Sequence, residues 1–141
     1  MLSNSINPPP NPHLLRLLIV DDKRHVREEL SRLLQITGEV EVVGEAANGQ
    51  EAIHQAEVLR PDVVLMDLEM PILDGWEALR EIKQHHLAPR VVVLSIHTEV
   101  ENTQRALQEG ADAFVPKGAS FNVLLSAILA QRDTQEEKEK D

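Results

Sequence analysis

Residues 63–75 read VVLMDLEMPILDG, a short apolar run that ends in an acidic residue and leads into a turn. A run of this length, Val63–Asp67, is typical of a buried strand. Asp74 stands three residues before Glu77, a spacing that satisfies free amides at the start of a helix. The stretch therefore predicts a strand, a loop and a helix, with Asp67 at the carboxyl end of the strand.

The same unit repeats on both sides of this stretch. Apolar runs alternate with amphipathic segments, and the runs are Leu14–Val20, Val40–Ala46, Val63–Asp67, Val91–Ile96 and Ala113–Val115. Strict alternation requires right-handed crossovers between parallel strands. We predict an α/β fold of the flavodoxin-like kind, a doubly wound five-stranded parallel sheet in the order 2-1-3-4-5 with five helices. The unbroken run Val91–Leu94 predicts a fourth strand that is covered on both faces.

Local signals mark where the helices begin and end. The predicted capping pairs are Asn48 with Glu51, Asp74 with Glu77 and Thr98 with Glu101. Gly38 and Gly110 are expected to end the first and fourth helices. We expect the last helix to begin after Ser120 and to bury Leu124, Leu125, Ile128 and Leu129.

Length and composition limit the domain organisation. The chain has 141 residues, of which 42% are hydrophobic, enough for one domain with a core. Residues 1–13 are rich in Pro, Asn and Ser and are predicted to form a disordered tail. Residues 133–141 are polar or charged and predict a charged C-terminal tail, which can extend the preceding helix. The folded domain is thus expected over residues 14–132.

Charge and hydropathy exclude several classes of protein. A net charge of −10 argues against direct nucleic-acid contact, because such surfaces need clustered Lys and Arg. The run Leu14–Val20 is interrupted by Arg16 and is too short to cross a membrane. The chain has no cysteine and no signal-peptide pattern, so we expect a soluble cytoplasmic protein.

Chemically capable residues follow four of the predicted strands. They are Asp21 and Asp22 after the first strand, Asp67 at the third, Ser95 at the fourth and Lys117 at the fifth. In a doubly wound sheet, ligands bind beyond these carboxyl ends. Three adjacent carboxylates repel one another unless a cation neutralises them, and oxygen ligands favour Mg²⁺ over zinc.

This set of residues is suited to phosphoryl transfer. Asp67 is a candidate nucleophile for an aspartyl phosphate, and Lys117 and Ser95 can stabilise the phosphoryl oxygens. Taken singly, an Asp at a strand end is more often a helix cap, Lys117 a solvated side chain and Ser95 a loop hydroxyl. Their joint placement at one end of one sheet favours the functional interpretation.

Several motifs resemble those of a known family. They are LIVDD at Leu18–Asp22, DLEMP at Asp67–Pro71 followed by Asp74-Gly75, VLS at Val93–Ser95 and GADAFVPK at Gly110–Lys117. From about Leu15 to Leu129 the chain resembles the receiver domains of two-component response regulators. Within that family it looks most like regulators of the NarL/LuxR type, which carry a helix-turn-helix output.

The resemblance implies a signalling phosphoacceptor rather than an enzyme. A sensor histidine kinase would transfer a phosphoryl group to Asp67 in a reaction that needs Mg²⁺. Asp22, Asp67 and the backbone carbonyl of Glu69 would bind the ion directly, and Asp21 mostly through water. Lys117 would contact the phosphoryl group.

The same resemblance assigns the switch residues. Ser95 and Phe114 match the hydroxyl and aromatic positions that respond to phosphorylation. Phe114 lacks the hydroxyl of the commoner Tyr. Pro116 precedes Lys117 and Gly118 follows it, whereas the family often has Pro after the lysine, so a cis bond is not carried over.

Other interpretations remain open at this point. A haloacid dehalogenase-like phosphatase would need a second Asp where Glu69 stands, and a flavin module would need a less acidic first loop. Glu69 and His97 either control access to the site or are ordinary loop residues. The chain either acts as a free-standing receiver or is followed by a DNA-binding part, and Val123 widens the apolar arc of the last helix enough to suggest a homodimer.

Overall fold

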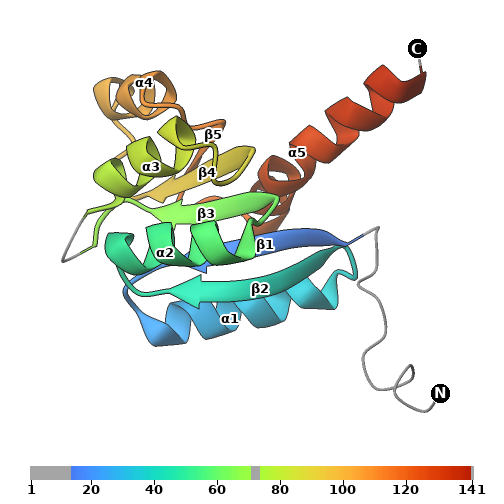
Figure 1. Cartoon of the computed structure of the whole chain (residues 1–141), viewed down its shortest axis with the longest axis horizontal. Helices are drawn as coiled ribbons and strands as arrows, with labels where there is room; N and C mark the ends of the chain where they lie inside the picture. Colours follow the sequence, from blue (N-terminus) through green and yellow to red (C-terminus); the bar gives the residue numbers. More distant parts are fainter. Residues whose placement is uncertain (1–13, 71–73, 141) are drawn as a thin grey trace.

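Strands and helices alternate without exception in the computed structural model, which describes residues 14–70 and 74–140 (Figure 1). The elements are β1 Leu15–Val20, α1 Arg24–Ile36, β2 Val40–Ala46, α2 Gly49–Leu59, β3 Val63–Asp67, α3 Gly75–Gln84, β4 Arg90–Ser95, α4 Val100–Gln108, β5 Ala113–Pro116 and α5 Phe121–Lys140. All neighbouring strands are parallel, in the order β2-β1-β3-β4-β5. The predicted fold class is confirmed.

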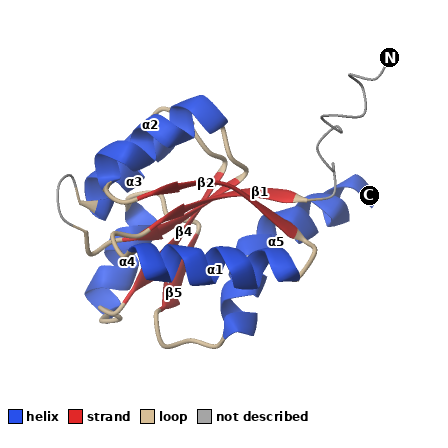
Figure 2. Ribbon diagram, turned by 90° about the horizontal axis from the view of Figure 1, so that it is seen from below, coloured by secondary structure: helices blue, strands red, loops and turns tan. Residues whose placement is uncertain are grey.

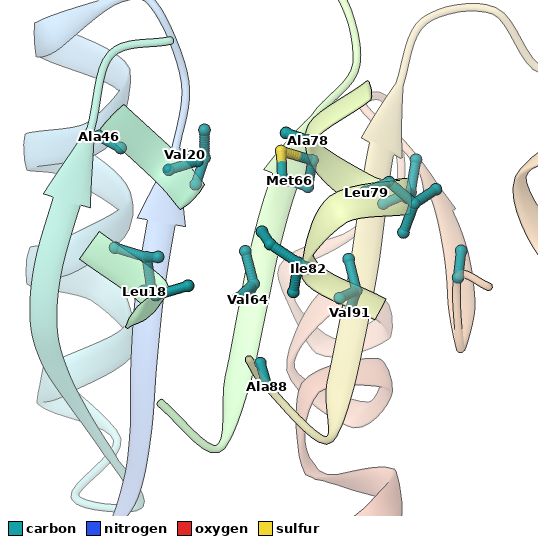
Figure 3. Packing of buried hydrophobic residues seen from close by; sticks show 14 of the residues in the cluster. Leu18, Val20, Ala46, Val64, Met66, Ala78, Leu79, Ile82, Ala88 and Val91 are labelled. Carbon is teal, nitrogen blue, oxygen red and sulfur yellow. The ribbon is translucent and has the colours of Figure 1, made fainter. Parts of the chain in front are cut away.

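Helices cover both faces of the sheet (Figure 2). The sheet thus separates two layers of core residues, one on each face. One layer packs α2 and α3, with Ala106 of α4, against one face of the strands. The other packs α1 and α5 against the opposite face. Figure 3 shows the first layer, in which Leu79 and Ile82 of α3 lie close to strand residues such as Val91.

The central strands are buried on both sides. All of β3 is buried, and so is β4 after Arg90, which confirms the prediction for the fourth strand. Along β4, Val91 and Val93 belong to one core layer and Val92 and Leu94 to the other. Each such side chain contributes about 1.5–3 kcal/mol of transfer free energy, so the sheet holds the strand ends firmly in place.

Two of the three predicted helix caps are confirmed. The Asn48 side chain accepts a hydrogen bond from the Glu51 N–H, and the Asp74 side chain accepts one from the Glu77 N–H. The third prediction is wrong, because Glu99 and not Thr98 precedes α4 and no side chain caps it. The Thr103 N–H bonds to the Glu99 carbonyl, so the helical ladder starts one residue too late for Thr98 to reach it.

The ends of the helices agree in part with expectation. Gly38 and Gly110 adopt φ angles of 78° and 113° just after α1 and α4, in the left-handed region that favours glycine. In α5, Leu124 and Ile128 are buried, whereas Leu125 and Leu129 are only partly buried at the edge of the layer. The prediction of four fully buried side chains was therefore too broad.

The sequence predicts a tail at each end of the chain. Residues 133–140 continue α5 as helical backbone, so the charged C-terminal segment extends the preceding helix. The tail predicted over residues 1–13 lies outside the described residues. Within the described part of the chain, no helix combines the length and apolar character needed to cross a membrane.

Candidate functional site

Buried polar side chains gather at the carboxyl edge of the sheet. Among the described residues, those that are polar or charged and buried are Asp21, Asp67 and Ser95, with 3%, 1% and 1% exposure. They follow or end β1, β3 and β4, which are neighbours in the sheet. Burying polar groups costs free energy unless they are paired. The fold therefore keeps these three side chains at this edge at the expense of stability.

Asp67 is held by both its strand and the following loop. It pairs with Leu94 in the β3–β4 ladder, and its Oδ1 accepts a 3.0 Å hydrogen bond from the Glu69 N–H. The start of α3 packs directly on this backbone, since a Cβ built on Gly75 would stand 2.5 Å from the Asp67 carbonyl oxygen. Only glycine fits there, and the position of Asp67 depends on it.

Lys117 closes the other side of the site. Its Nζ lies 3.0 Å from Oδ1 of Asp67 and 3.8 Å from Oε2 of Glu69. The lysine sits just beyond β5, whose Pro116 pairs with Ser95 of β4, and the Lys117 N–H bonds to the Ser95 carbonyl. Two adjacent strand ends therefore bring the predicted lysine and serine together.

Three carboxylates form a cluster beside Lys117. Oxygen atoms of Asp21, Asp22 and Asp67 all lie within 4.8 Å of one another. Asp21 is oriented by the Lys23 N–H, which donates to its Oδ1 at 2.8 Å. Oδ1 of Asp22 and Oδ2 of Asp67 are buried without a hydrogen-bond partner, although Lys23 Nζ stands 3.8 Å from the former.

This donor set fits a hard divalent cation. Buried anionic oxygens without hydrogen bonds are costly, and a cation bound between them would remove that cost. Every potential ligand in the cluster is oxygen, the preference of Mg²⁺ and Ca²⁺. The predicted residues Asp21, Asp22 and Asp67 thus lie where a metal could be held.

Burial raises the pKa of Asp67 to about 6, against the opposing effect of Lys117 and with a further upward contribution from the Glu69 side chain. Burial also acts to lower the pKa of Lys117, but the neighbouring carboxylates, Asp67 first, outweigh it and the net shift is upward. At neutral pH Asp67 is therefore ionised and Lys117 charged, as a nucleophile and a charge-stabilising group require.

The side chain of Glu69 takes a place that the sequence did not indicate. The Ser95 hydroxyl donates a 2.5 Å hydrogen bond to Oε1 of Glu69, across 26 residues of sequence. The His97 N–H donates to Ser95 Oγ at 2.9 Å, and Nε2 of His97 lies 4.0 Å from Oε1 of Glu69. Of the two interpretations left open, these contacts favour a role for Glu69 within the site.

A cavity of about 530 Å³ opens next to these groups. Its lining includes Asp21, Glu69 and Lys117. Apolar residues of α1, β4, β5 and α5 also line it, among them Leu30, Leu94, Val115 and Leu124. The polar cluster therefore borders a cavity whose lining is partly apolar.

Specific side-chain contacts join α3 to α4. The Arg105 guanidinium of α4 stacks 4.0 Å from the ring centroid of Trp76 on α3, and Arg80 pairs with Glu109 at 3.5 Å. Phe114 of β5 is partly buried and packs against the same core layer as Trp76.

The described residues contain no cis peptide bond, as expected where Gly118 and not Pro follows Lys117.

Comparison with known proteins gives a consistent picture. Residues 17–129 match the family model of the response regulator receiver domain. The chain is 37% identical over 112 residues to the nitrate/nitrite response regulator NarL of Escherichia coli, which covers 79% of this chain and 52% of that protein. It is 40% identical over 114 residues to a protein-glutamate methylesterase/protein-glutamine glutaminase of Carboxydothermus hydrogenoformans, covering 80% of this chain and 34% of that protein.

Solved structures extend the likeness to three dimensions. The receiver domain of NarL from Mycobacterium tuberculosis superposes with a TM-score of 0.79 at 33% identity, covering 84% of this chain and 96% of that one. The response regulator domain of Thermotoga maritima CheB gives 0.72 at 34% identity, covering 87% and 95%. The chain thus spans nearly all of these isolated domains, but only about a third to a half of the curated relatives above.

Proposed function

Because the chain belongs to the response regulator receiver domain family, we propose that Asp67 accepts a phosphoryl group from a phosphohistidine of a sensor histidine kinase. The observation that carries the proposal is the asymmetry of the Asp67 carboxylate. Oδ1 is held by Lys117 and the Glu69 N–H, whereas Oδ2 is buried and has no hydrogen-bond partner. One oxygen fixes the orientation and the other is left to react.

The proposed reaction is an in-line displacement at phosphorus. A carboxylate oxygen of Asp67 forms the new P–O bond as the P–N bond to the donor imidazole breaks, and the imidazole nitrogen then takes up a proton. Lys117 and the Ser95 hydroxyl stabilise charge on the phosphoryl oxygens, since catalysis of this reaction is mostly positioning and electrostatics. The chain is then a phosphoacceptor that assists its own phosphorylation.

Magnesium is the proposed cofactor. Asp21, Asp22, Asp67 and the backbone carbonyl of Glu69 would hold it, with Asp21 acting mostly through water. When bound, Mg²⁺ neutralises the crowded carboxylates and the phosphoryl oxygens together. The partnerless Oδ1 of Asp22 and the grouping of the three carboxylates within 4.8 Å support this assignment.

Phosphorylation is proposed to act as a population shift. Ser95 would move its hydroxyl from Glu69 to the phosphoryl group, and Phe114 would turn inward and change the surface of α4, β5 and α5. A second subunit would bind through α5 together with α1 or α4, and Val123 of α5 is 50% exposed. The acidic chain itself is not proposed to contact nucleic acid, and the proposed place of action is the cytoplasm.

The relatives described above differ in the output that their names give. NarL is named as a response regulator, whereas the methylesterase/glutaminase relative is named as an enzyme. We favour the first, transcriptional pattern, on the resemblance to regulators of the NarL/LuxR type. A free-standing receiver that signals through protein contacts is the alternative, and the reading frame beyond Asp141 distinguishes the two.

Labelling with acetyl phosphate and Mg²⁺ tests the proposed phosphoacceptor. Intact-mass spectrometry should show the gain of one phosphoryl group in wild type and its loss in Asp67→Asn. The matched control is Asp62→Asn, the same substitution just before the opposite end of β3. Labelling of Asp67→Asn to the wild-type extent would show that another residue is the nucleophile.

A further inference from the structure

The two groups that should receive the phosphoryl oxygens already contact another anion. Ser95 Oγ donates its hydrogen bond to Oε1 of Glu69 at 2.5 Å, and Oε2 of the same carboxylate lies 3.8 Å from Lys117 Nζ. Lys117 in turn lies 3.0 Å from Asp67. The Glu69 carboxylate therefore bridges the hydroxyl and the ammonium beside the proposed nucleophile.

We propose that the Glu69 side chain is an internal occupant of the phosphoryl-binding position, held between Ser95 and Lys117, and that it must be displaced before a phosphoryl group can bind. This inference rests on the proposed function, which supplies the ligand. It makes Glu69 a residue that determines how readily the site accepts phosphoryl groups and their analogues.

The energetic argument is one of competition for the same donors. A serine hydroxyl has one proton to donate, so Ser95 cannot bond to Glu69 and to a phosphoryl oxygen at once. A phosphoryl group next to an undisplaced Glu69 would also place like charges together beside Asp67. Both effects oppose binding, and both disappear when Glu69 withdraws.

The surroundings allow that withdrawal. The Glu69 side chain is 30% exposed, which leaves part of it open to solvent, although its Oε2 is buried without a hydrogen-bond partner. His97 is 55% exposed, and its Nε2 lies 4.0 Å from Glu69 Oε1, so an exposed side chain stands next to this carboxylate. Asp67 and Ser95, by contrast, are buried, so Glu69 is the member of this group with room to move, and the Ser95 hydroxyl then needs only to turn from Glu69 to the phosphoryl oxygen.

The test measures the binding of beryllofluoride, an analogue of the phosphoryl group, by calorimetry at saturating Mg²⁺. We compare wild type with Glu69→Gln, which keeps the shape and removes the charge, and with Glu69→Ala, which removes the occupant. Glu77→Gln is the control, because this exposed residue of α3 changes the net charge equally but lies outside the site. The rate of labelling by acetyl phosphate is measured on the same four proteins.

Loss of one charge-assisted contact corresponds to about a tenfold change in affinity. We expect Glu69→Ala to bind beryllofluoride about tenfold more tightly than wild type and to be labelled faster. Glu69→Gln should lie between them, and Glu77→Gln should match wild type. Unchanged or weaker binding by Glu69→Ala overturns the inference, and so does equal tightening by Glu77→Gln.

The same experiment separates this inference from the proposed function. If wild type is not labelled at Asp67, the proposed function itself fails. If wild type is labelled but the Glu69 variants bind and react as it does, the receiver chemistry stands and only the role of Glu69 is refuted.

Discussion

Asp67→Asn should stabilise the metal-free protein, although it removes the proposed nucleophile. The pKa of Asp67 is raised from 3.8 to about 6 mainly by burial, so the ionised carboxylate is less stable in the folded chain than in the unfolded chain. Each pKa unit corresponds to about 1.4 kcal/mol. The ionised side chain therefore costs up to about 3 kcal/mol, and we expect a neutral Asn to recover about 1–3 kcal/mol at pH 7.5.

The sign of the effect gives it a characteristic dependence on pH. Between pH 3.8 and about 6 the folded protein binds more protons at Asp67 than the unfolded protein does, so the free energy of unfolding falls as the pH rises. The advantage of Asp67→Asn should consequently be absent below pH 3.8, grow through this window and level off above it.

Urea unfolding in the presence of EDTA, at a series of pH values, measures this difference. Adding Mg²⁺ should then stabilise wild type, by about 2.7 kcal/mol at a hundred times its dissociation constant, and leave Asp67→Asn almost unaffected. If the variant is no more stable than wild type at pH 7.5, or if its advantage does not change with pH, the argument from buried charge is wrong.

Three further results are expected. Gly75→Ala should lower stability by about 1–3 kcal/mol and slow the labelling of Asp67, because the new Cβ would stand 2.5 Å from the Asp67 carbonyl oxygen. Gly118→Ala is the control, because a Cβ there would have no atom within 4 Å. Equal urea midpoints for the two variants would contradict this prediction. Asp22→Ala should weaken Mg²⁺ binding by about tenfold or more in calorimetry, since it removes one carboxylate of the cluster; an affinity equal to that of wild type would exclude Asp22 as a ligand. Sedimentation should reveal a dimer strengthened by beryllofluoride and weakened by Val123→Lys, because Val123 is half exposed on α5; a monomer in every condition would rule out this interface.

Strand positions could be predicted closely because their signals are local. The predicted runs Val40–Ala46 and Val63–Asp67 coincide with β2 and β3. The first and fifth runs differ from β1 and β5 by one residue at one end, and the fourth differs from β4 by one residue at each end. Once the sheet order is known, the gathering of Asp21, Asp67 and Lys117 follows from the rule that parallel strands end at one edge. The fold was therefore accessible from the sequence, and so was the placement of these side chains at one edge of the sheet.

The remaining features depend on tertiary contacts that leave no periodic signal. The late start of α4 at Val100 is set by the loop after Ser95, not by the Thr98–Glu101 spacing. The hydrogen bond from Ser95 to Glu69 depends on the side-chain rotamers of two residues that are 26 positions apart in the sequence. Leu125 and Leu129 pack against the core layer but stay partly exposed, which the helical spacing alone does not distinguish from full burial.

The stacking of Arg105 on Trp76 has a practical consequence for following the protein in solution. Trp76 is the single tryptophan of the chain, so its near-ultraviolet-excited emission originates at the junction of α3 and α4. A guanidinium at 4.0 Å from the indole ring lies close enough to affect that emission, and its departure would change the intensity and wavelength of the signal. The intrinsic fluorescence of Trp76 therefore reports on the position of α4. It needs no attached dye and can be followed on the stopped-flow timescale.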